Sequence, residues 1–348
     1  MSAEPPRSGL LHRVASIPTP IIFVSSVLIA VILLWSGGSL GDVFDAARDA
    51  DIALLVAAFA LYLVGLAILC FRWDVLVRMV KGISNIPRAA EAFLTSVVIN
   101  YAAPIGLAVP TRAALTKRAL GLSAAETGAA VLWEIGADVI VLGLGSALWL
   151  LLSGNEISAP SSNQLLVSAL LVVSAVAVLI AGAIFLRTKT SHWQRVRDTL
   201  KRILLFPRHR PATAGLALLV TVVYWTAQAI VLATILRALD GPTAPKLILG
   251  LITIPVLVGM LSPVPGGAGI REALMIGIAH VEGADSAVVL LAALIYRVAL
   301  FAAIPILYAG VRLWLRTEGI RTISLEEIAH SPENGTISVN AQGKEPYR

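Results

Sequence analysis

Two acidic residues and one arginine stand inside long apolar runs of the sequence. Glu134 and Asp138 lie four residues apart, a spacing that places both carboxyl groups on one face of a helix. Two carboxylates so close in an apolar setting resist joint ionisation, so one holds a proton unless a base neutralises the pair. Arg297, in a later run, is the expected base. The pattern predicts a proton or substrate site or, alternatively, a buried ion pair that holds helices together.

A further group of candidate residues surrounds two bends rich in proline and glycine. Asn100 and Pro104 precede the first bend, and Arg112 follows it. The second bend and its flank contain Pro265, Gly266, Gly267, Gly269, Arg271 and Glu272. Such bends leave backbone groups unpaired, which a membrane tolerates only inside protein or beside a wet cavity. We therefore predict the substrate site at the bends, where the half-helix ends at Pro104 and Pro265 supply partial charges.

Two arginines lie just beyond these bends. A guanidinium is suited to bidentate contact with a phosphate, so Arg112 and Arg271 are candidate ligands for a lipid headgroup. Arg112 is also explained as an anchor at a helix end, with its charge at the membrane surface. Arg271 lacks that explanation, because the topology derived below places it outside or within the membrane.

The composition identifies the environment in which these residues act. Of the 348 residues, 57% are hydrophobic and 14% are charged, against about 25% charged in soluble domains. The chain is therefore predicted to be an all-α polytopic membrane protein. One cysteine excludes an internal disulfide, and the five histidines lack the spacing of metal ligands. Neither a metal nor another cofactor is expected.

Six apolar runs are long enough to cross a bilayer as helices. They cover residues 17–35, 52–70, 128–152, 164–186, 213–236 and 286–311. The first is interpreted as a retained helix rather than a removed signal peptide, because it lacks a small-residue cleavage site. Six crossings make the chain a multi-pass protein.

The loops between these runs give the orientation, because lysine and arginine accumulate on the cytoplasmic side. The acidic loops 36–51 and 153–163 are predicted outside, and the basic loops 71–88 and 187–211 inside. Both termini then fall in the cytoplasm of a protein in the cell inner (plasma) membrane. Within the first basic loop, Arg72-Trp73 is interpreted as an interfacial anchor with its indole at the level of the headgroups.

Two further apolar stretches, 89–110 and 247–281, each begin and end on one predicted side. We expect each to be a re-entrant helical hairpin, the first entering from inside and the second from outside. Three crossings per half make the second half (about 164–316) inverted relative to the first (about 17–152), an architecture typical of secondary transporters. The alternative is that proline and glycine merely kink two long helices.

The membrane domain is predicted to cover residues 17–316, between a cytoplasmic segment at 1–16 and a polar cytoplasmic tail at 317–348. The loop 187–211 interleaves bases with apolar residues, as amphipathic helices on anionic inner leaflets do. Nucleic-acid binding is the rival explanation of the positive charge. It is not favoured, because the bases lie where the topology requires them.

Many of these residues together resemble a known family. They are Arg72-Trp73, Asn100, Pro104, Arg112, Gly121-Leu122-Ser123, Glu134, Asp138, the segment Pro265-Gly266-Gly267-x-Gly269-x-x-Glu272, and Arg297. Over roughly residues 17–315 the chain resembles the flippase-like membrane domain of the lysylphosphatidylglycerol synthase family. The segment at 265–272 is the most specific piece.

The resemblance implies a lipid translocase that moves a headgroup-modified lipid between leaflets, and some relatives occur in polyprenyl-linked glycan or hopanoid pathways. The soluble synthase domain has no counterpart here, so lysyl transfer is not implied. The chain departs from the family pattern at two places. The segment 106–112 lacks an expected acid, and Ile135 stands where an arginine often follows the glutamate.

Together these observations predict a translocase, not an enzyme, for a phospholipid or a polyprenyl-type lipid. The hairpin tips are expected to enclose a polar cavity that contains Asn100, Glu134, Asp138, Arg271, Glu272 and Arg297. Two alternatives stay open: a non-catalytic partner of an envelope-lipid biosynthetic enzyme, and a membrane-embedded transferase that uses Glu272 or Asp138. Such an enzyme or a second copy of the chain is a candidate partner.

Overall fold

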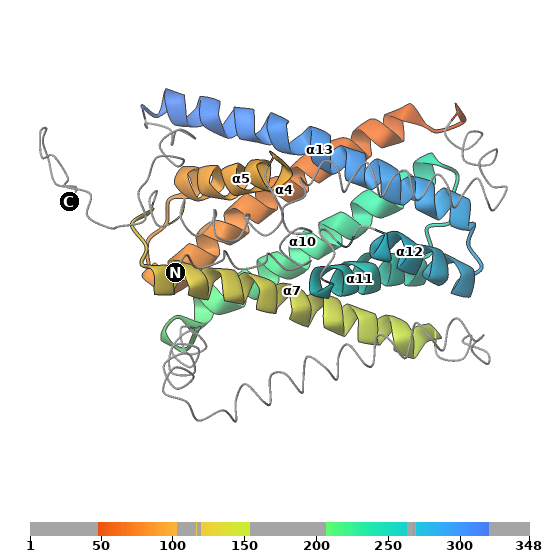
Figure 1. Cartoon of the computed structure of the whole chain (residues 1–348), viewed down its shortest axis with the longest axis horizontal. Coiled ribbons are helices and arrows are strands. Elements are labelled where there is room, and N and C mark those ends of the chain that lie inside the picture. Colours follow the sequence, from red (N-terminus) through yellow and green to blue (C-terminus); the bar gives the residue numbers. More distant parts are fainter. Residues whose placement is uncertain are drawn as a thin grey trace, which may run out of the picture.

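The computed structural model of the chain describes residues 48–102, 116, 120–153, 207–262, 267 and 269–319, and these form helices without any β-strand (Figure 1). The helices are α4 (Ile52–Lys81), α5 (Ile86–Ala102), α7 (Ala124–Ser153), α10 (Pro211–Ala238), α11 (Pro245–Leu261), α12 (Ile270–Val281) and α13 (Ser286–Thr317). The predicted crossings at 17–35 and 164–186 lie outside the described residues, as do nearly all of the basic loop 187–211 and of the polar tail.

Four of the described helices, α4, α7, α10 and α13, are long and apolar enough to cross a membrane. They contain the predicted crossings at 52–70, 128–152, 213–236 and 286–311, so these predictions are confirmed as helices. Side-chain caps fix two of the starts, because Asp51 Oδ1 accepts from Ala53 N at 2.8 Å and Asp285 Oδ1 accepts from Ala287 N at 2.7 Å.

Helix α4 continues well beyond its predicted crossing, so the prediction of a loop over 71–88 is wrong for its first part. The helix ends at Lys81, and Gly82 then takes a left-handed conformation (φ +83°) and returns its N–H to Arg78 O. Hydropathy falls at Arg72 and Asp74, but both side chains are buried against protein. Burial by neighbouring helices, rather than by lipid, explains why the helix persists there.

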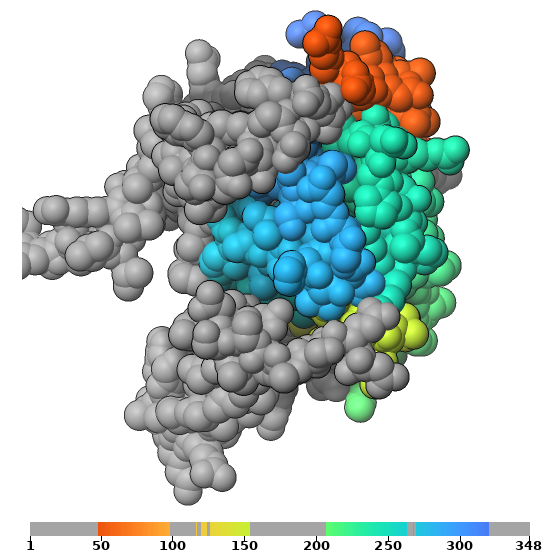
Figure 2. Space-filling view, turned by 90° about the vertical axis from the view of Figure 1, so that its right-hand side faces the viewer, coloured from red at the N-terminus to blue at the C-terminus, as the bar shows by residue number. Residues whose placement is uncertain are grey.

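At one end of the bundle, α4 and α13 begin while α7 and α10 finish (Figure 2). The backbone N–H of Asp51 donates to Ala238 O at 2.8 Å, which ties the start of α4 to the last residue of α10. Ser153 Oγ, in the last residue of α7, donates to Glu282 Oε1 at 2.9 Å, just beyond α12. Helices α4 and α13 therefore run in one direction and α7 and α10 in the opposite one, as the predicted topology requires.

Two basic side chains fasten the opposite end. Lys81 Nζ donates to the backbone carbonyls of Leu120 and Gly121, which precede α7. Arg210 Nη1, just before α10, donates to Arg78 O at 2.7 Å, so this carbonyl in the last turn of α4 accepts from both Gly82 N and Arg210. Hydrogen bonds from cations thus close this end, whereas Glu282 accepts hydrogen bonds at the other.

Helices α11 and α12 form a hairpin whose outer ends meet. Lys246 Nζ, at the start of α11, lies 3.4 Å from Glu282 Oε2, which directly follows α12. The chain reverses between Leu261 and Ile270, so the alternative of a single kinked helix is wrong for this stretch. Helix α5 starts from the opposite end of the bundle. Figure 1 shows it beside α4, at the end of the bundle away from α11 and α12.

The hairpin packs tightly on α7 through glycines. A Cβ added to Gly250 of α11 would lie 2.6 Å from Trp149 Nε1, and one added to Gly145 of α7 would lie 2.6 Å from Thr253 Cγ2. Small residues let membrane helices approach closely enough for their side chains to interlock. The α7–α11 contact therefore depends on these two positions.

We expect Gly250→Ala to destabilise the protein by about 1–3 kcal/mol, the usual cost of forcing a methyl group into a packed contact. The added group would displace the Trp149 indole, whose N–H donates to Glu282 Oε1 at 3.0 Å. Gly143→Ala on α7 is the control, because a Cβ there meets nothing within 4 Å. Thermal unfolding in detergent should give a lower midpoint for Gly250→Ala only, and equal midpoints would contradict the packing.

Candidate functional site: two buried charged groups

The first charged group joins α4 to α7. Arg72 Nη1 donates to Asp138 Oδ1 at 2.5 Å, and Arg72 Nη2 donates to Glu134 Oε1 at 3.0 Å and to Asp138 Oδ2 at 3.2 Å. The side chains are 4% exposed for the arginine and 10% for each acid. The two acids therefore share one helix face, as their spacing predicts, and one guanidinium binds both. We call these three residues the α4–α7 ion cluster.

Helix α10 completes the surroundings of this cluster with two aromatic residues. Trp225 Nε1 donates to Asp138 Oδ1 at 2.8 Å. The Tyr224 ring centroid lies 5.5 Å from Arg72 Cζ, within range of a cation–π interaction. Adjacent residues of α10 therefore contact the acid and the base of one ion pair, and the cluster ties together three helices.

Two sequence predictions about these residues are corrected by the contacts. The base that neutralises Glu134 and Asp138 is Arg72, whereas Arg297 was expected to do so. Arg72 and Trp73 are 3% and 0% exposed, so they are core residues and not an interfacial anchor. A charged residue buried to this degree needs a partner of opposite charge, and the two acids on α7 supply it.

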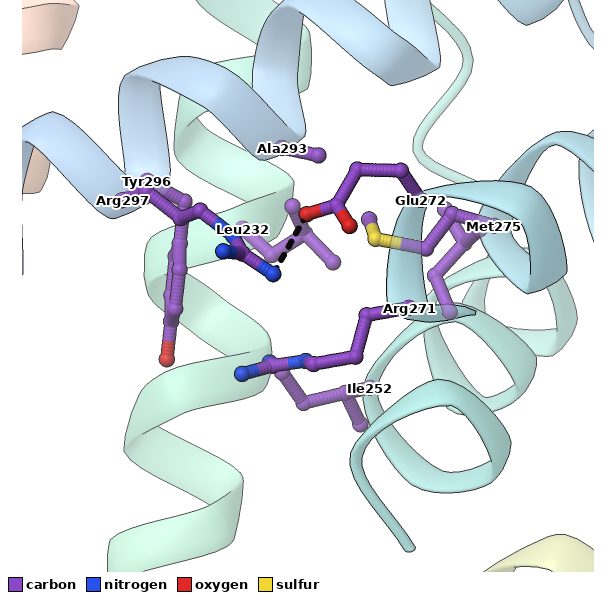
Figure 3. Close-up of a pocket in the computed structure, with 9 residues that line it drawn as sticks. Leu232, Ile252, Arg271, Glu272, Met275, Ala293, Tyr296 and Arg297 are labelled. Atoms are coloured by element: carbon purple, nitrogen blue, oxygen red, sulfur yellow. Dashed lines mark ion pairs between the residues drawn. The ribbon is translucent and has the colours of Figure 1, made fainter. Parts of the chain in front are cut away.

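The second charged group joins α12 to α13. Arg297 Nη2 lies 2.6 Å from Glu272 Oε1, with the side chains 13% and 8% exposed. Glu272 Oε2 also accepts from Gly269 N at 2.8 Å, which caps the start of α12. One carboxylate thus fixes the first turn of α12 and holds it to the middle of α13 (Figure 3).

Arg271 extends into the same space between these helices (Figure 3). Two glycines, Gly259 and Gly267, lie close to its aliphatic stem. A Cβ on Gly259 would lie 2.8 Å from Arg271 Cγ, and one on Gly267 would lie 2.6 Å from the Gly259 Cα. Gly267 and Gly269 also have positive φ (+64° and +80°). The predicted Gly267 and the unpredicted Gly259 therefore let the hairpin close around the arginine.

These side chains line one pocket, together with apolar residues of α10, α11 and α13. Its charged and polar lining is formed by Arg271, Glu272, Tyr296 and Arg297, and we call it the α12–α13 pocket. The enclosed space is about 20 Å³, which is room for roughly one water molecule. Among the described residues, the Arg271 guanidinium forms no ion pair. The pocket therefore has a net positive charge.

A tyrosine connects the pocket to the bundle core. Tyr296 OH donates to Gln228 Oε1 at 2.5 Å, and its ring packs edge-on against Tyr62 at a centroid distance of 5.3 Å. Gln228, on α10, is completely buried. Tyr224, one turn earlier, lies within cation–π range of Arg72 in the ion cluster, and Leu232, one turn later, lines the pocket. Helix α10 thus passes between the two charged groups.

Sequence analysis missed the contribution of α10. Apart from threonines, Tyr224, Trp225 and Gln228 are the polar-capable residues of the apolar run 213–236, and their spacing of one and four residues places them on adjoining faces of a helix. That pattern is a signal of contact with buried polar groups.

The structure brings together only part of the predicted site. Arg271, Glu272 and Arg297 line one pocket, whereas Glu134 and Asp138 belong to the separate ion cluster. Gly267 and Gly269 shape the bend, and Asn100 lies in the last turn of α5. Outside the described residues lie Pro104, Arg112, Pro265 and Gly266. Within the described ranges, His, Cys, Asp and Glu form no group suited to a metal ion.

Comparison with known proteins gives the family. The model of the lysylphosphatidylglycerol synthase TM region matches residues 22–308, which include every helix described above except the last residues of α13. A search of curated proteins found no match. The matched range covers most of the chain and contains both charged groups. The chain is a membrane protein that belongs to the family of the lysylphosphatidylglycerol synthase TM region.

Proposed function

We propose that this protein moves an amphiphilic lipid with an anionic or zwitterionic headgroup, either a phospholipid or a polyprenyl-type lipid, between the leaflets of the cell membrane. The observation that carries the proposal is the net positive α12–α13 pocket among apolar helices. Charge in such a place is costly and usually serves transport or ligand binding. A lipid phosphate is the natural ligand, because guanidinium groups bind it through paired hydrogen bonds.

The hairpin supports the proposal because its bend brings the N-terminus of α12 to the pocket. We propose that α11 and α12 enter the membrane and return, with α5 and the following bend as the inverted counterpart. The headgroup path then includes Asn100, Pro104 and Arg112 on that side. Pro265 and Gly266 are assigned to the opposite bend. Helix ends in the membrane interior supply partial charges to a substrate in several transporters.

The Glu272–Arg297 ion pair is proposed to be the barrier to the headgroup. The pocket has room for roughly one water molecule, so a phosphate can enter only when α12 and α13 separate. A phosphate that replaces Glu272 as the partner of Arg297 would leave the guanidinium satisfied during this step. Alternation between the closed and the open arrangement would expose the site to each leaflet in turn.

The α4–α7 ion cluster is proposed to hold the helices together rather than to bind lipid. Asp138 already accepts from Arg72 and Trp225, and the cluster does not line the α12–α13 pocket. We further propose that the basic loop 187–211 contacts anionic lipids of the inner leaflet and that both termini are cytoplasmic.

Leaflet exchange in proteoliposomes tests the proposal. Purified protein is reconstituted in phosphatidylcholine vesicles with trace fluorescent lipids that differ only in headgroup. We expect the protein to accelerate exchange, relative to vesicles without protein, more for lipids with an anionic phosphate headgroup than for a glycosyldiacylglycerol, whose sugar headgroup has no phosphate, because only the former complements the pocket charge. Headgroup conversion by the pure protein would instead indicate a transferase. Absence of exchange with every lipid, from folded protein, would favour a partner of an envelope-lipid enzyme.

A further inference from the structure

An apolar groove lies between α7, α10 and α11. Its volume is about 440 Å³, within the range of roughly 300–1,000 Å³ that is common for ligand sites. Leu142, Ile248 and Ile252 are buried and form its floor, and Val222 and Ile230 are 44% and 51% exposed at its mouth. The groove is therefore open at the surface of the bundle and closed toward the core.

The groove adjoins both charged groups. Ile252 is buried and lines both the groove and the α12–α13 pocket, so the two spaces share this side chain in their walls. Trp225 lines the groove as well, while its indole N–H donates to Asp138 in the ion cluster. The apolar groove therefore lies next to the pocket that Arg271, Glu272 and Arg297 line.

The surroundings of the groove determine what can fill it. Its mouth lies on α7 and α10, two helices long and apolar enough to cross a membrane. An unfilled space of this size forfeits the dispersion contacts of its lining. In the hydrocarbon region of a bilayer the material that can supply those contacts is a lipid chain, because water is excluded from an apolar lining.

We infer that this groove holds a hydrocarbon chain of the lipid whose headgroup reaches the α12–α13 pocket, with Ile252 as the partition between chain and headgroup. The inference rests on the proposed function and adds to it a site for the apolar part of the substrate. An apolar side chain attracts a lipid chain no more strongly than another lipid chain does. The specificity of the groove therefore comes from its position beside the charged pocket.

Photo-crosslinking tests the inference without a transport assay. The probe is phosphatidylglycerol with a diazirine on one acyl chain, present in trace in phosphatidylcholine vesicles that contain the full chain. After irradiation, mass spectrometry locates the label. We expect label on the groove floor at 248–252, and we expect Val222→Trp to reduce it severalfold, because the indole would fill the mouth.

The neighbouring residue provides a matched control. Val223 is 46% exposed, against 44% for Val222, but it does not line the groove. Val223→Trp should therefore leave the label on the floor unchanged, and thermal unfolding checks that both variants fold. The same probe with a phosphatidylcholine headgroup should label the floor severalfold less, and so should the phosphatidylglycerol probe on Arg271→Gln.

Two results would overturn the inference. One is equal label on the floor in wild type, Val222→Trp and Val223→Trp. The other is crosslinking of these residues to a second copy of the chain in place of lipid. Label that follows the expected pattern in a protein without leaflet exchange would support the groove and count against the proposed function, so the two failures are distinguishable.

Discussion

Replacing Arg72 with glutamine is expected to have the largest effect on stability of any single substitution considered for this protein. The change leaves Glu134 and Asp138 as two carboxylates that are each 10% exposed and have lost the guanidinium that binds them both. Removing one partner of a buried ion pair costs about 3–5 kcal/mol. We therefore expect low yields of folded protein and a strongly lowered unfolding midpoint in detergent.

The matched control is Arg316→Gln, at the exposed last turn of α13, for which we expect little change. A triple variant in which Glu134→Gln and Asp138→Asn accompany Arg72→Gln should recover part of the lost stability, because no uncompensated charge then remains in the cluster. If Arg72→Gln alone had the same unfolding midpoint as the wild type, the cluster would not hold the helices together.

Replacing Arg297 with glutamine is expected to have the largest effect on transport. Glu272 loses its ion-pair partner, and a phosphate loses one of the two arginines that line the pocket. Glu272 keeps its hydrogen bond from Gly269 N, so α12 retains its cap. Leaflet exchange of an anionic phospholipid should fall by at least about tenfold, which corresponds to about 1.4 kcal/mol of lost interaction.

A double variant separates a role in binding from a role in folding. Arg297→Gln alone should lower the unfolding midpoint, and Glu272→Gln added to it should restore part of that midpoint, because both charges are then gone. We expect exchange to stay low in both proteins. Exchange at the wild-type rate in the double variant would instead identify the ion pair as purely structural.

The helices were predictable because hydropathy and topology report them directly. Four apolar runs became α4, α7, α10 and α13. The chain reversal at 262–269 followed from the requirement that the flanking helices each cross once, and Lys246 and Glu282 confirm it. The sequence also contains a signal for the end of α4, because a lysine in the last turn followed by a glycine is a common helix stop.

The partners of the buried charges were harder to predict. The i,i+4 spacing of Glu134 and Asp138 gives the helix face that they share, but not which helix faces them. Arg72 is interpreted from the sequence as an interfacial anchor, because it follows the predicted crossing at 52–70 and precedes Trp73 and Asp74. Only the tertiary packing of α4 against α7 and α10 shows that it is buried.

The division of the predicted site into two charged groups changes the proposed mechanism. The ion cluster on α4 and α7 is closely paired, whereas the pocket between α12 and α13 has an excess of positive charge. Helix α10 contacts both, through Trp225 for the cluster and Gln228 for Tyr296. We propose that α10 is the fixed element against which the hairpin moves.

The central claim is that the positive charge of the α12–α13 pocket binds the headgroup of a transported lipid. The most direct measurement is leaflet exchange of an anionic phospholipid in proteoliposomes, comparing wild type with Arg271→Gln. Arg237→Gln is the control, because this exposed arginine in the last turn of α10 lies outside the pocket. Arg271→Gln should lower exchange severalfold while it unfolds at the wild-type temperature, and Arg237→Gln should exchange normally. Equal exchange by all three proteins would contradict the account.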